Sequence, residues 1–471
     1  MSDNPLEAFG AWISGTADDW PEDARRSAHR EFIDTIAVMV PGAIEPAVRK
    51  IAPLARHWGQ GPCHTIGETV ALAAPWAALV NGCAGHALDF DDNFDPPKAH
   101  ASTVLVPAIF AVADEHGASG GQCIDAYIVG LQIQGRIGQG VNPAHRNRGW
   151  HATATMGAMG AAAAAARLMK LDSERSAMAL SIATSMAAGF MAQFGTMTKP
   201  LHAGLAAKAG VMAASFAAAG LTAGWHTLDG PNGMNVLMVG PDLEDLRAAN
   251  RQPEHGQTLY YECAHVGAPL LITEHAFRVK RFPNCGASHR SIDAVLDLRE
   301  AHGITADAVE KVNVRAPLTH LNNLMYRQPE TGLEGKFSIE YALACALVTG
   351  DCTLADFTDD AVMRPEIRAL FPRIHRDPVD LPESQLPTTV TITLKGGRVV
   401  EQTVTMPKGS KPAPFPTEQY WRKFDSCLGT LMRPTDKEAL RQTLEALPAL
   451  DDAGALTRCL AVPLGGNGAA S

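Results

Sequence analysis

Paired cysteines are absent from this sequence. The nine cysteines are odd in number, lie far apart and form no C-x-x-C motif, which argues against a disulfide framework and against a cysteine zinc site. The N-terminal stretch MSDNPLEAFGAWISG lacks the basic and apolar regions of a secretory signal. Gly, Thr, Ser and Gln interrupt every apolar run before it reaches the roughly 18 residues of a membrane span. We therefore expect a soluble, cytoplasmic protein with reduced thiols and no membrane partner.

Motifs for nucleotides and metals are also missing. There is no P-loop and no H-E-x-x-H, and the glycines of MGAMGAA follow a histidine instead of a strand, so they are no dinucleotide fingerprint. The net charge of −10, with no block of Lys and Arg, argues against nucleic acid as a partner. An anionic substrate would need a local basic pocket. What remains is acid–base chemistry by His, Lys and Asp, so we expect neither a metal nor an organic cofactor.

Small side chains dominate the middle of the chain. Every residue from Ala152 to Ala166 is Ala, Gly, Thr or Met, which predicts a buried helix that neighbouring backbones approach closely. His151 stands just before it, where the helix dipole disfavours imidazolium and favours a neutral ring that accepts a proton. Lys199 precedes Pro200, and Pro is common in the first helical turn, so we expect a second helix to begin there. Its free N–H groups and the Lys199 ammonium would bind a carboxylate. Alternatively, His151 is a capping or core histidine and Lys199 is a solvated loop cation.

Helical patterns continue through the first 270 residues. We expect helices at 24–40, 45–58, 74–88, 103–116, 121–138, 152–170, 173–193 and 200–219. Pro41-Gly42 is expected to close the first of them.

The composition changes near Phe277. A helix at 289–302, a strand containing Val312 and Val314, a helix at 338–347 and a hairpin with alternating Val390, Ile392 and Leu394 follow. The tail from Pro416 returns to helix. We therefore expect a mainly α protein, with a large all-α domain made from residues 1–272 and 412–465 and an inserted, smaller α+β lid domain at 276–408. A cleft between the two domains is the natural place for a site.

Several further stretches could carry chemistry. Carboxylates gather between Asp89 and His100, where they would raise one another's pKa and suit acid–base work, or else form a capping and solubility feature. The stretch VKRFPNCGASH, residues 279–289, could clamp carboxylates or serve as a charged hinge between domains. His202 is expected on the helix face of Lys199. His320 and Tyr326 are expected in a loop after the strand.

Six stretches together resemble the MmgE/PrpD family: HALDFDD with a histidine further on, GWHATATMGAMGAA, GTMTKPLHAGLAAKAG, KRFPNCGASH, KFSIEYALA and WRKF. The resemblance runs from Phe9 to Leu428. It implies a large all-α domain built from both chain ends, an inserted α+β lid, a homodimer, and no metal or organic cofactor. Matched by motif, the active-site residues of the family's decarboxylases fall on Asp89, Asn93 (a Thr in those enzymes), His100, His151, Lys199 and Lys280.

Two positions depart from those decarboxylases. Asn284 stands where they carry a lid histidine, and their active-site tyrosine falls near His320, with Tyr326 the only tyrosine close by. The segment NFDPPKAH also lacks the Trp-containing insertion that is typical of the family's 2-methylcitrate dehydratases.

Proton transfer at a carbon next to a carboxylate is the chemistry that the resemblance implies. We expect a lyase, either a dehydratase or a decarboxylase, that acts on a small anionic di- or tricarboxylate. His151 is expected to be the base, His100 or Asp89 the partner acid, and Lys199 the group that stabilises the charge. The expected substrate-binding residues are Asn93, His202, Lys280, His320 and Tyr326.

Two alternatives stay open. An epimerase of a small dicarboxylate needs two opposed acid–base groups, and His100 with His151 could serve. The chain could also be a non-catalytic, carboxylate-binding homologue, although a scaffold without catalysis would have no need for both His151 and Lys199.

Overall fold

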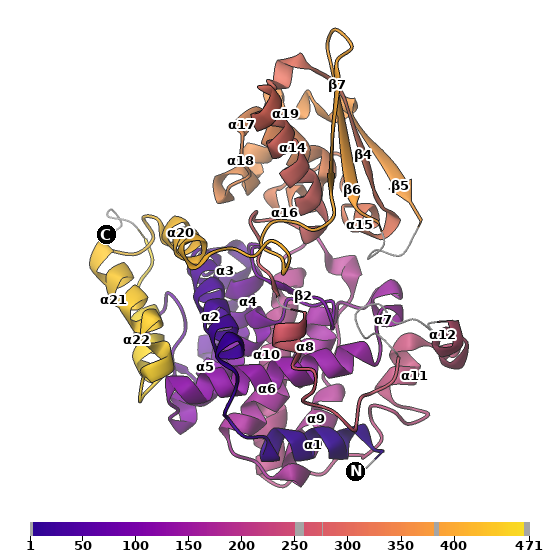
Figure 1. The fold of residues 1–471 in the computed structure, drawn as a ribbon. Helices are drawn as coiled ribbons and strands as arrows, with labels where there is room; N and C mark the ends of the chain where they lie inside the picture. The colour runs from indigo at the N-terminus through magenta and orange to yellow at the C-terminus, as the bar shows by residue number, and fades with distance from the viewer. Residues whose placement is uncertain (1–2, 250–258, 276, 381–385, 466–471) are drawn as a thin grey trace.

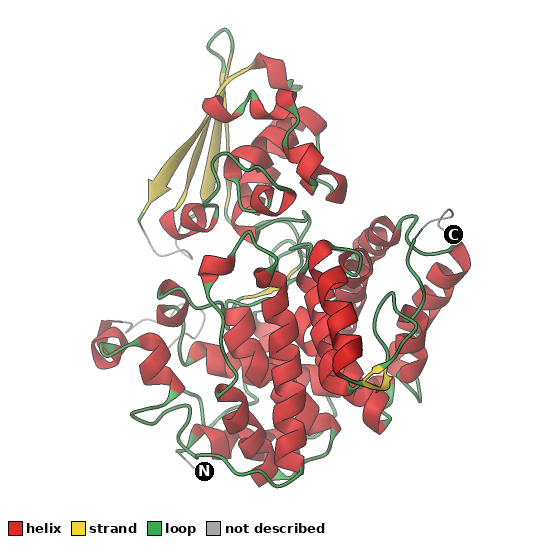
Figure 2. Ribbon diagram, turned by 180° about the vertical axis from the view of Figure 1, so that it is seen from behind, coloured by secondary structure: helices red, strands yellow, loops and turns green. Residues whose placement is uncertain are grey.

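The computed structural model describes residues 3–249, 259–275, 277–380 and 386–465. Figure 1 shows a larger helical body below and a smaller body above it, which carries a sheet on one side and helices on the other. Figure 2 shows that the long strands lie in the smaller body, while helices make up nearly all of the larger one. The expectation of a mainly α protein is confirmed.

Helices from both ends of the chain form the larger body. They are α1 (Pro5–Gly15), α2 (Glu22–Gly42), α3 (Pro46–Trp58), α4 (Ala74–His86), α5 (Ser102–His116), α6 (Gly120–Gln139), α7 (Ala144–Asn147), α8 (Ala152–Leu168), α9 (Ser173–Thr184), α10 (Thr198–Ala218), α11 (Met234–Val239), α12 (Leu243–Ala249), α13 (Leu271–Glu274), α20 (Thr417–Leu428), α21 (Pro434–Glu445) and α22 (Gly454–Leu460). Its short strands are β1 (Gln60–Cys63), β2 (Asn93–Phe94) and β3 (Phe277–Arg278).

The smaller body holds the four-stranded sheet. Its elements are α14 (His289–His302), β4 (Val309–Pro317), α15 (Leu318–Asn323), α16 (Gly332–Gly335), α17 (Ile339–Thr349), α18 (Asp359–Val362), α19 (Pro365–Arg368), β5 (Ile374–Val379), β6 (Thr388–Leu394) and β7 (Val399–Val404). The strand order is β5-β4-β6-β7, with β4 and β5 parallel and the other pairs antiparallel. Along β6, Val390, Ile392 and Leu394 are buried and alternate with partly exposed threonines, as the period of two predicts.

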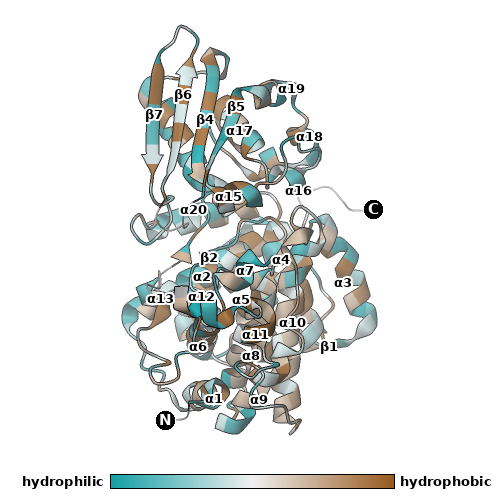
Figure 3. Cartoon of the chain, turned by 90° about the vertical axis from the view of Figure 1, so that its right-hand side faces the viewer, coloured by the Kyte–Doolittle hydropathy of each residue, from teal (hydrophilic) through white to brown (hydrophobic). Residues whose placement is uncertain are grey.

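Small residues bring α4, α8 and α10 into close contact. All residues from Ala152 to Ala166 are buried, and Figure 3 draws α8 and α10 mostly in the pale and brown tones of apolar side chains. A Cβ at Gly204 would lie 2.2 Å from the Leu79 carbonyl oxygen, and one at Gly210 would lie 2.3 Å from Ala161 Cβ. By length and composition α10 could cross a membrane, but 61% of its most apolar stretch is buried among these neighbours, as in a core helix. Packing therefore outweighs the low helix propensity of glycine here.

The C-terminal helices return to the N-terminal ones. α20 packs against α2, and Tyr420, Phe424 and Leu428 join the same cluster of buried residues as Phe9 and Phe32. A separate cluster fills the smaller body, from Phe282 to Leu394. Within the larger body β2 pairs with β3, with Asn93 aligned with Arg278 and Phe94 with Phe277, and the chain enters the smaller body after β3. The exact domain boundaries remain a prediction.

Four local expectations need correction. The helix expected at 173–193 ends at Thr184, the last residue of α9. α2 does not stop before Pro41: it continues to Gly42. α10 begins at Thr198, so Lys199 lies inside its first turn and not in the loop before Pro200. His320 belongs to the short helix α15, not to a loop. Strand β5 was not predicted, because IHRDPV has no alternating apolar pattern and its parallel partner β4 is distant in sequence.

We predict that Gly204→Ala destabilises the helical body. The added methyl would meet the backbone of α4, and overpacking of this kind costs about 1–3 kcal/mol, more than the roughly 1 kcal/mol that Ala gains over Gly in helix propensity. The midpoint of thermal unfolding, followed by the helical circular dichroism signal, should fall by several degrees, at about 2–4 °C per kcal/mol. The control is Gly15→Ala at the exposed end of α1, where a Cβ meets nothing within 4 Å. An unchanged midpoint for Gly204→Ala would contradict the close contact of α4 and α10.

Candidate active site

Asp89 lies in the turn that follows α4, and its backbone is in an uncommon conformation. Its φ angle is 52°, in the left-handed region that a non-glycine residue seldom adopts. The side chain is buried. A conformation of this kind persists only where the surroundings determine it, and such residues gather at functional sites.

Two ammonium groups hold the Asp89 carboxylate. Lys199 Nζ donates to Asp89 Oδ1 over 2.5 Å, and Lys280 Nζ lies 3.0 Å from the same oxygen. Burial alone would raise the pKa of Asp89, but the Lys199 and Lys280 charges hold it well below its usual value. Asp89 is therefore a permanent carboxylate in the free protein. Lys199 is itself buried, so the alternative of a solvated loop cation is wrong.

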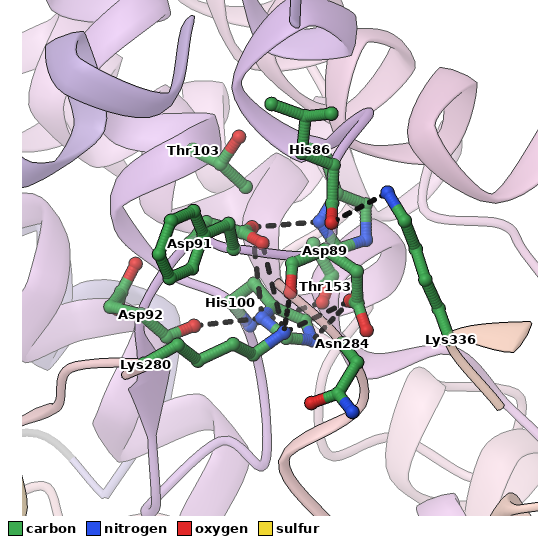
Figure 4. A network of polar contacts seen from close by, with 12 residues as sticks. His86, Asp89, Asp91, Asp92, His100, Thr103, Thr153, Lys280, Asn284 and Lys336 are labelled. Atoms are coloured by element: carbon green, nitrogen blue, oxygen red, sulfur yellow. Dashed lines mark hydrogen bonds and ion pairs between the residues drawn. The ribbon is translucent and has the colours of Figure 1, made fainter. Parts of the chain in front are cut away.

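His86 and His100 surround the second carboxylate of the turn, that of Asp91. His86 Nδ1 lies 2.7 Å from Asp91 Oδ2, and His100 Nδ1 donates to the Asp92 carbonyl oxygen over 2.7 Å. Burial lowers the pKa of both histidines, so both rings are neutral at pH 7. A neutral His100 with its proton on Nδ1 has a free lone pair on Nε2, which lies 4.0 Å from Asp89 Oδ1. Figure 4 shows this network, which Lys280 and Lys336 enter from opposite sides.

His151 occupies the N-cap position of α8, as its place in the sequence predicts. Its Nδ1 lies 3.0 Å from His202 Nδ1, and its buried Nε2 has no hydrogen-bond partner among the described residues. The pKa of His151 is well below 6.5, chiefly because the ring is buried and next because Lys199 is close. The direction agrees with the expectation from the helix dipole, but burial is the main cause. Burial also lowers the pKa of His202, to about 4.

Many of these groups line a cavity between the two bodies. Including its open mouth it encloses about 850 Å³. Of the expected site residues it is lined by Asp89, Asn93, His100, His151, Lys199, Lys280 and His320. His202 and Tyr326 are not among the described lining residues: His202 lies behind His151, and Tyr326 donates from its hydroxyl to the Phe194 carbonyl oxygen over 3.2 Å.

Several residues of the cavity and its network were not predicted from the sequence. His86 and Asp91 are fully buried members of the network, and His86 opens the quoted motif HALDFDD, so its presence there was a usable signal. Further cations line the cavity mouth, namely Lys98, Arg146, Arg278 and Lys408. No short-range pattern marks them, because they converge only through the fold.

A cation site is the obvious alternative for the acidic part of the network. One ligand atom each of His86, Asp89, Asp91 and His100 lies within 4.8 Å of the others. Lys280 Nζ, however, lies 3.0 Å from Asp89 Oδ1 and 3.9 Å from Asp91 Oδ1, and Lys199 contacts Asp89. A metal ion would be repelled by these ammonium groups and would compete with them for the same oxygens. The charge of this cluster is already balanced by lysine.

A second acidic group lies behind the network. Asp92, Glu31 and Asp34 are all buried. The pKa of Asp92 is raised to about 7, first by burial and then by the nearby charges of Asp91 and Asp34. Asp92 Oδ1 accepts a hydrogen bond from the Ser102 N–H over 3.2 Å, so one oxygen of the carboxyl group is anchored to the start of α5.

A charge-rich cavity of His, Lys and Asp, set between a helical body and a smaller α+β body, is the arrangement of an acid–base enzyme site. Comparison with known proteins narrows this class. Residues 7–245 match the MmgE/PrpD N-terminal domain and residues 282–448 match the MmgE/PrpD C-terminal domain. The chain belongs to the MmgE/PrpD family.

Curated relatives match over nearly the whole chain. A cis-aconitate decarboxylase of Mus musculus is 28% identical, over 98% of this chain and 94% of the relative. One of Aspergillus terreus is 29% identical, over 93% and 92%. One of Homo sapiens is 28% identical, over 86% and 82%. These relatives are lyases by name, and they are what this chain is similar to.

We predict that Asp92→Asn changes how stability depends on pH. A carboxyl whose pKa is raised in the folded state keeps its proton where the unfolded chain has lost it, so the free energy of unfolding falls as pH rises from about 4 to about 7. Asn removes this loss while its amide oxygen can still accept from Ser102. The melting midpoint of the variant, relative to that of the parent, should therefore increase between about pH 5 and pH 8.

The same substitution at the exposed Asp19 controls for the change of net charge. A difference between the Asp92→Asn variant and the parent that stays constant over this pH range would show that Asp92 is ionised at both ends of it.

Proposed function

We propose that the protein is a lyase that acts on a small tricarboxylate through proton transfer at a carbon next to a carboxylate. The observation that carries the proposal is the cavity in which Asp89, Lys199 and Lys280 lie beside the neutral His151. The names of the relatives make decarboxylation of cis-aconitate the first reaction to test, with dehydration as the second.

The charge of the cavity favours a substrate with several carboxylates. Among the described residues that line it, six side chains are cationic and one, that of Asp89, is a carboxylate. Asp95 and Asp297, outside the lining, pair with Arg278, Lys98 and Lys408 and reduce the excess without cancelling it. A bound polyanion would complete the balance of charge in a site of low dielectric, where such interactions are strong.

Lys199 and Lys280 are assigned to charge stabilisation. Loss of a proton next to a carboxylate builds an enediolate whose charge lies on the carboxylate oxygens, and pre-arranged ammonium groups lower its energy. Because Lys280 also lies 3.9 Å from Asp91 Oδ1, the two ammonium groups together balance the carboxylates of Asp89 and Asp91. The surplus of positive charge for the substrate comes from the other cations that line the cavity. Lys199 also lies in the first turn of α10, where the free N–H groups of the helix add to this field.

His151 is assigned as the base. For its free Nε2 to accept a proton, Nδ1 must carry the hydrogen and donate it to His202 Nδ1, so His202 selects the tautomer. Asp89 is unsuited to be the partner acid, because two ammonium groups keep it ionised. That role falls to His100, which lines the same cavity and which must first take up a proton on Nε2, because its ring is neutral in the free protein. The carboxylates of a bound substrate would raise the pKa of both histidines toward neutrality.

A second copy of the chain is the partner that we propose, on the basis of the family resemblance. Leu205 and Phe216 are exposed on α10, and Leu221 is exposed just after it. Leu205 and Phe216 lie three helical turns apart on one face, which a partner subunit would cover. Light scattering in solution tests this proposal through the molar mass.

Nuclear magnetic resonance in D₂O tests the function. The protein is incubated with cis-aconitate, citrate and a panel of dicarboxylates, and the spectra of the small molecules are followed. A decarboxylase yields a product with one carboxylate fewer and a deuterium at the former position of the carboxylate or its allylic neighbour. A dehydratase yields or consumes an alkene proton, and an epimerase exchanges a C–H without changing the formula. If no tricarboxylate reacts or exchanges, the lyase assignment is wrong, and binding measured by calorimetry would then favour the non-catalytic homologue.

We predict that His151→Gln lowers kcat by at least about a hundredfold while KM changes little, because Gln keeps a polar side chain but cannot take a proton. The kcat/KM of the parent should stay level from neutral pH to below pH 6.5 and then fall as His151 becomes protonated. In the variant this acidic limb should vanish or move.

His145→Gln is the matched control. His145 is also buried, its pKa is lowered to about 3 by burial, and it contacts Thr155 of the same helix, but it does not line the described cavity. It should keep the parent kcat. A parent kcat/KM that falls as pH rises through the same region would make imidazolium the active form and His151 a proton donor, which contradicts the role as base.

A further inference from the structure

Three lysines hold three successive carbonyl groups of the Asp89 turn. Lys336 Nζ donates to the Leu88 carbonyl oxygen over 2.7 Å, Lys280 Nζ to that of Asp89 over 2.8 Å, and Lys423 Nζ to that of Phe90 over 2.7 Å. All three side chains are buried. Each of these three successive carbonyl oxygens therefore accepts a hydrogen bond from a different buried ammonium group.

The three lysines come from distant parts of the chain. Lys336 follows α16 in the smaller body, Lys280 lies on the segment that enters the smaller body after β3, and Lys423 lies on α20. Lys280 and Lys423 also meet carboxylates: Lys280 lies 3.0 Å from Asp89 Oδ1, and Lys423 lies 2.8 Å from Asp34 Oδ1. Each of these two therefore has an ion pair that accounts for its burial.

Lys336 has no such pair. Among the described residues its ammonium forms a hydrogen bond to the Leu88 carbonyl and no ion pair within 4.0 Å. Burial lowers its pKa to about 8, and the more distant charges of Glu45 and Asp89 offset this effect only in part. Taking an ammonium out of water for one neutral acceptor is unfavourable, and an apolar side chain of similar size would fill the space more stably. The position of Lys336 is therefore not explained by stability.

The carbonyl group that accepts the hydrogen bond from Lys336 explains the position of this lysine. The Leu88 carbonyl belongs to the peptide bond that leads into Asp89, whose backbone is in the left-handed region. A rigid hydrogen bond to this peptide limits the rotation about φ of Asp89 and so the direction of its carboxylate. Lys336 reaches the turn from the smaller body, while Lys199 holds the carboxylate from the larger one.

We propose that Lys336 is a positioning residue: its ammonium fixes the Leu88–Asp89 peptide and thereby keeps the Asp89 carboxylate between Lys199 and Lys280. Contact of the smaller body with the larger one then completes the arrangement of charges in the cavity. Lys336 does not line that cavity among the described residues, so it acts through Asp89. The effect on turnover rests on the proposed lyase function, but the effect on the turn does not.

Lys336→Met tests the proposal, because Met has similar length and no donor. Hydrogen exchange of the backbone amides, followed by mass spectrometry, should become faster in peptides covering residues 86–92 and stay at the parent rate in peptides from β4, β6 and α17 of the smaller body. With a substrate found among the tricarboxylates, kcat should fall at least about tenfold while KM changes less than about threefold, as expected when a hydrogen bond that shapes the catalytic groups is lost. Lys311→Met, at an exposed position of β4, should leave the exchange at residues 86–92 and the turnover unchanged.

The outcomes separate this proposal from the proposed function. Exchange at residues 86–92 equal to that of the parent overturns the positioning role, and so does faster exchange across the whole smaller body, which would make Lys336 a general stabiliser. If no carboxylate reacts with the parent protein, the lyase assignment fails while the exchange experiment still decides the role of Lys336. Should Lys336→Met not fold, Lys336→Gln keeps a donor of shorter reach, and its exchange at residues 86–92 should lie between those of the parent and an Asp89→Asn variant.

Discussion

A single buried carboxylate with two ammonium partners is the interaction on which the cavity depends. The ion pairs of Asp89 with Lys199 and Lys280 join residues 110 and 191 positions apart in the chain. Burial of three charges is unfavourable unless they are close and well oriented. The helical body supplies that orientation: α10 brings Lys199, the turn after α4 brings Asp89, and the segment after β3 brings Lys280. Loss of any one partner would leave the others with an uncompensated charge.

The neutral histidines follow from the same constraint. His86, His100, His151 and His202 lie around the carboxylates without becoming charged, because burial and the neighbouring lysines disfavour a further positive charge. The site thus assigns charge stabilisation and proton transfer to different residue types. Lysines carry the fixed positive charge, and imidazole rings remain free to accept a proton.

The parts of this arrangement that could be predicted are those that local sequence determines. The run of Ala, Gly, Thr and Met from Ala152 to Ala166 predicted a buried helix, and the place of His151 directly before it predicted the N-cap residue. Motif resemblance supplied Asp89, His100, Lys199 and Lys280, and all four line the cavity. What local patterns could not supply were the contacts across the fold. Lys336 looks like an ordinary charge in KFSIEYALA, and its role depends on a carbonyl group 248 positions earlier. The first residue of α10 could not be predicted either, because Pro200 is compatible with several positions in the first turn of a helix.

The return of α20 to the larger body has a consequence for the synthesis of the chain. Helices α1 to α10 leave the ribosome first and contain most of the hydrophobic core of the larger body. Lys423 is nevertheless the donor to the Phe90 carbonyl and the ion partner of Asp34. The Phe90 carbonyl and the Asp34 carboxylate therefore lack their ammonium partner until nearly the whole polypeptide has been made. During synthesis the chain therefore passes through a long interval in which the helical body can collapse while its charged centre is still incomplete.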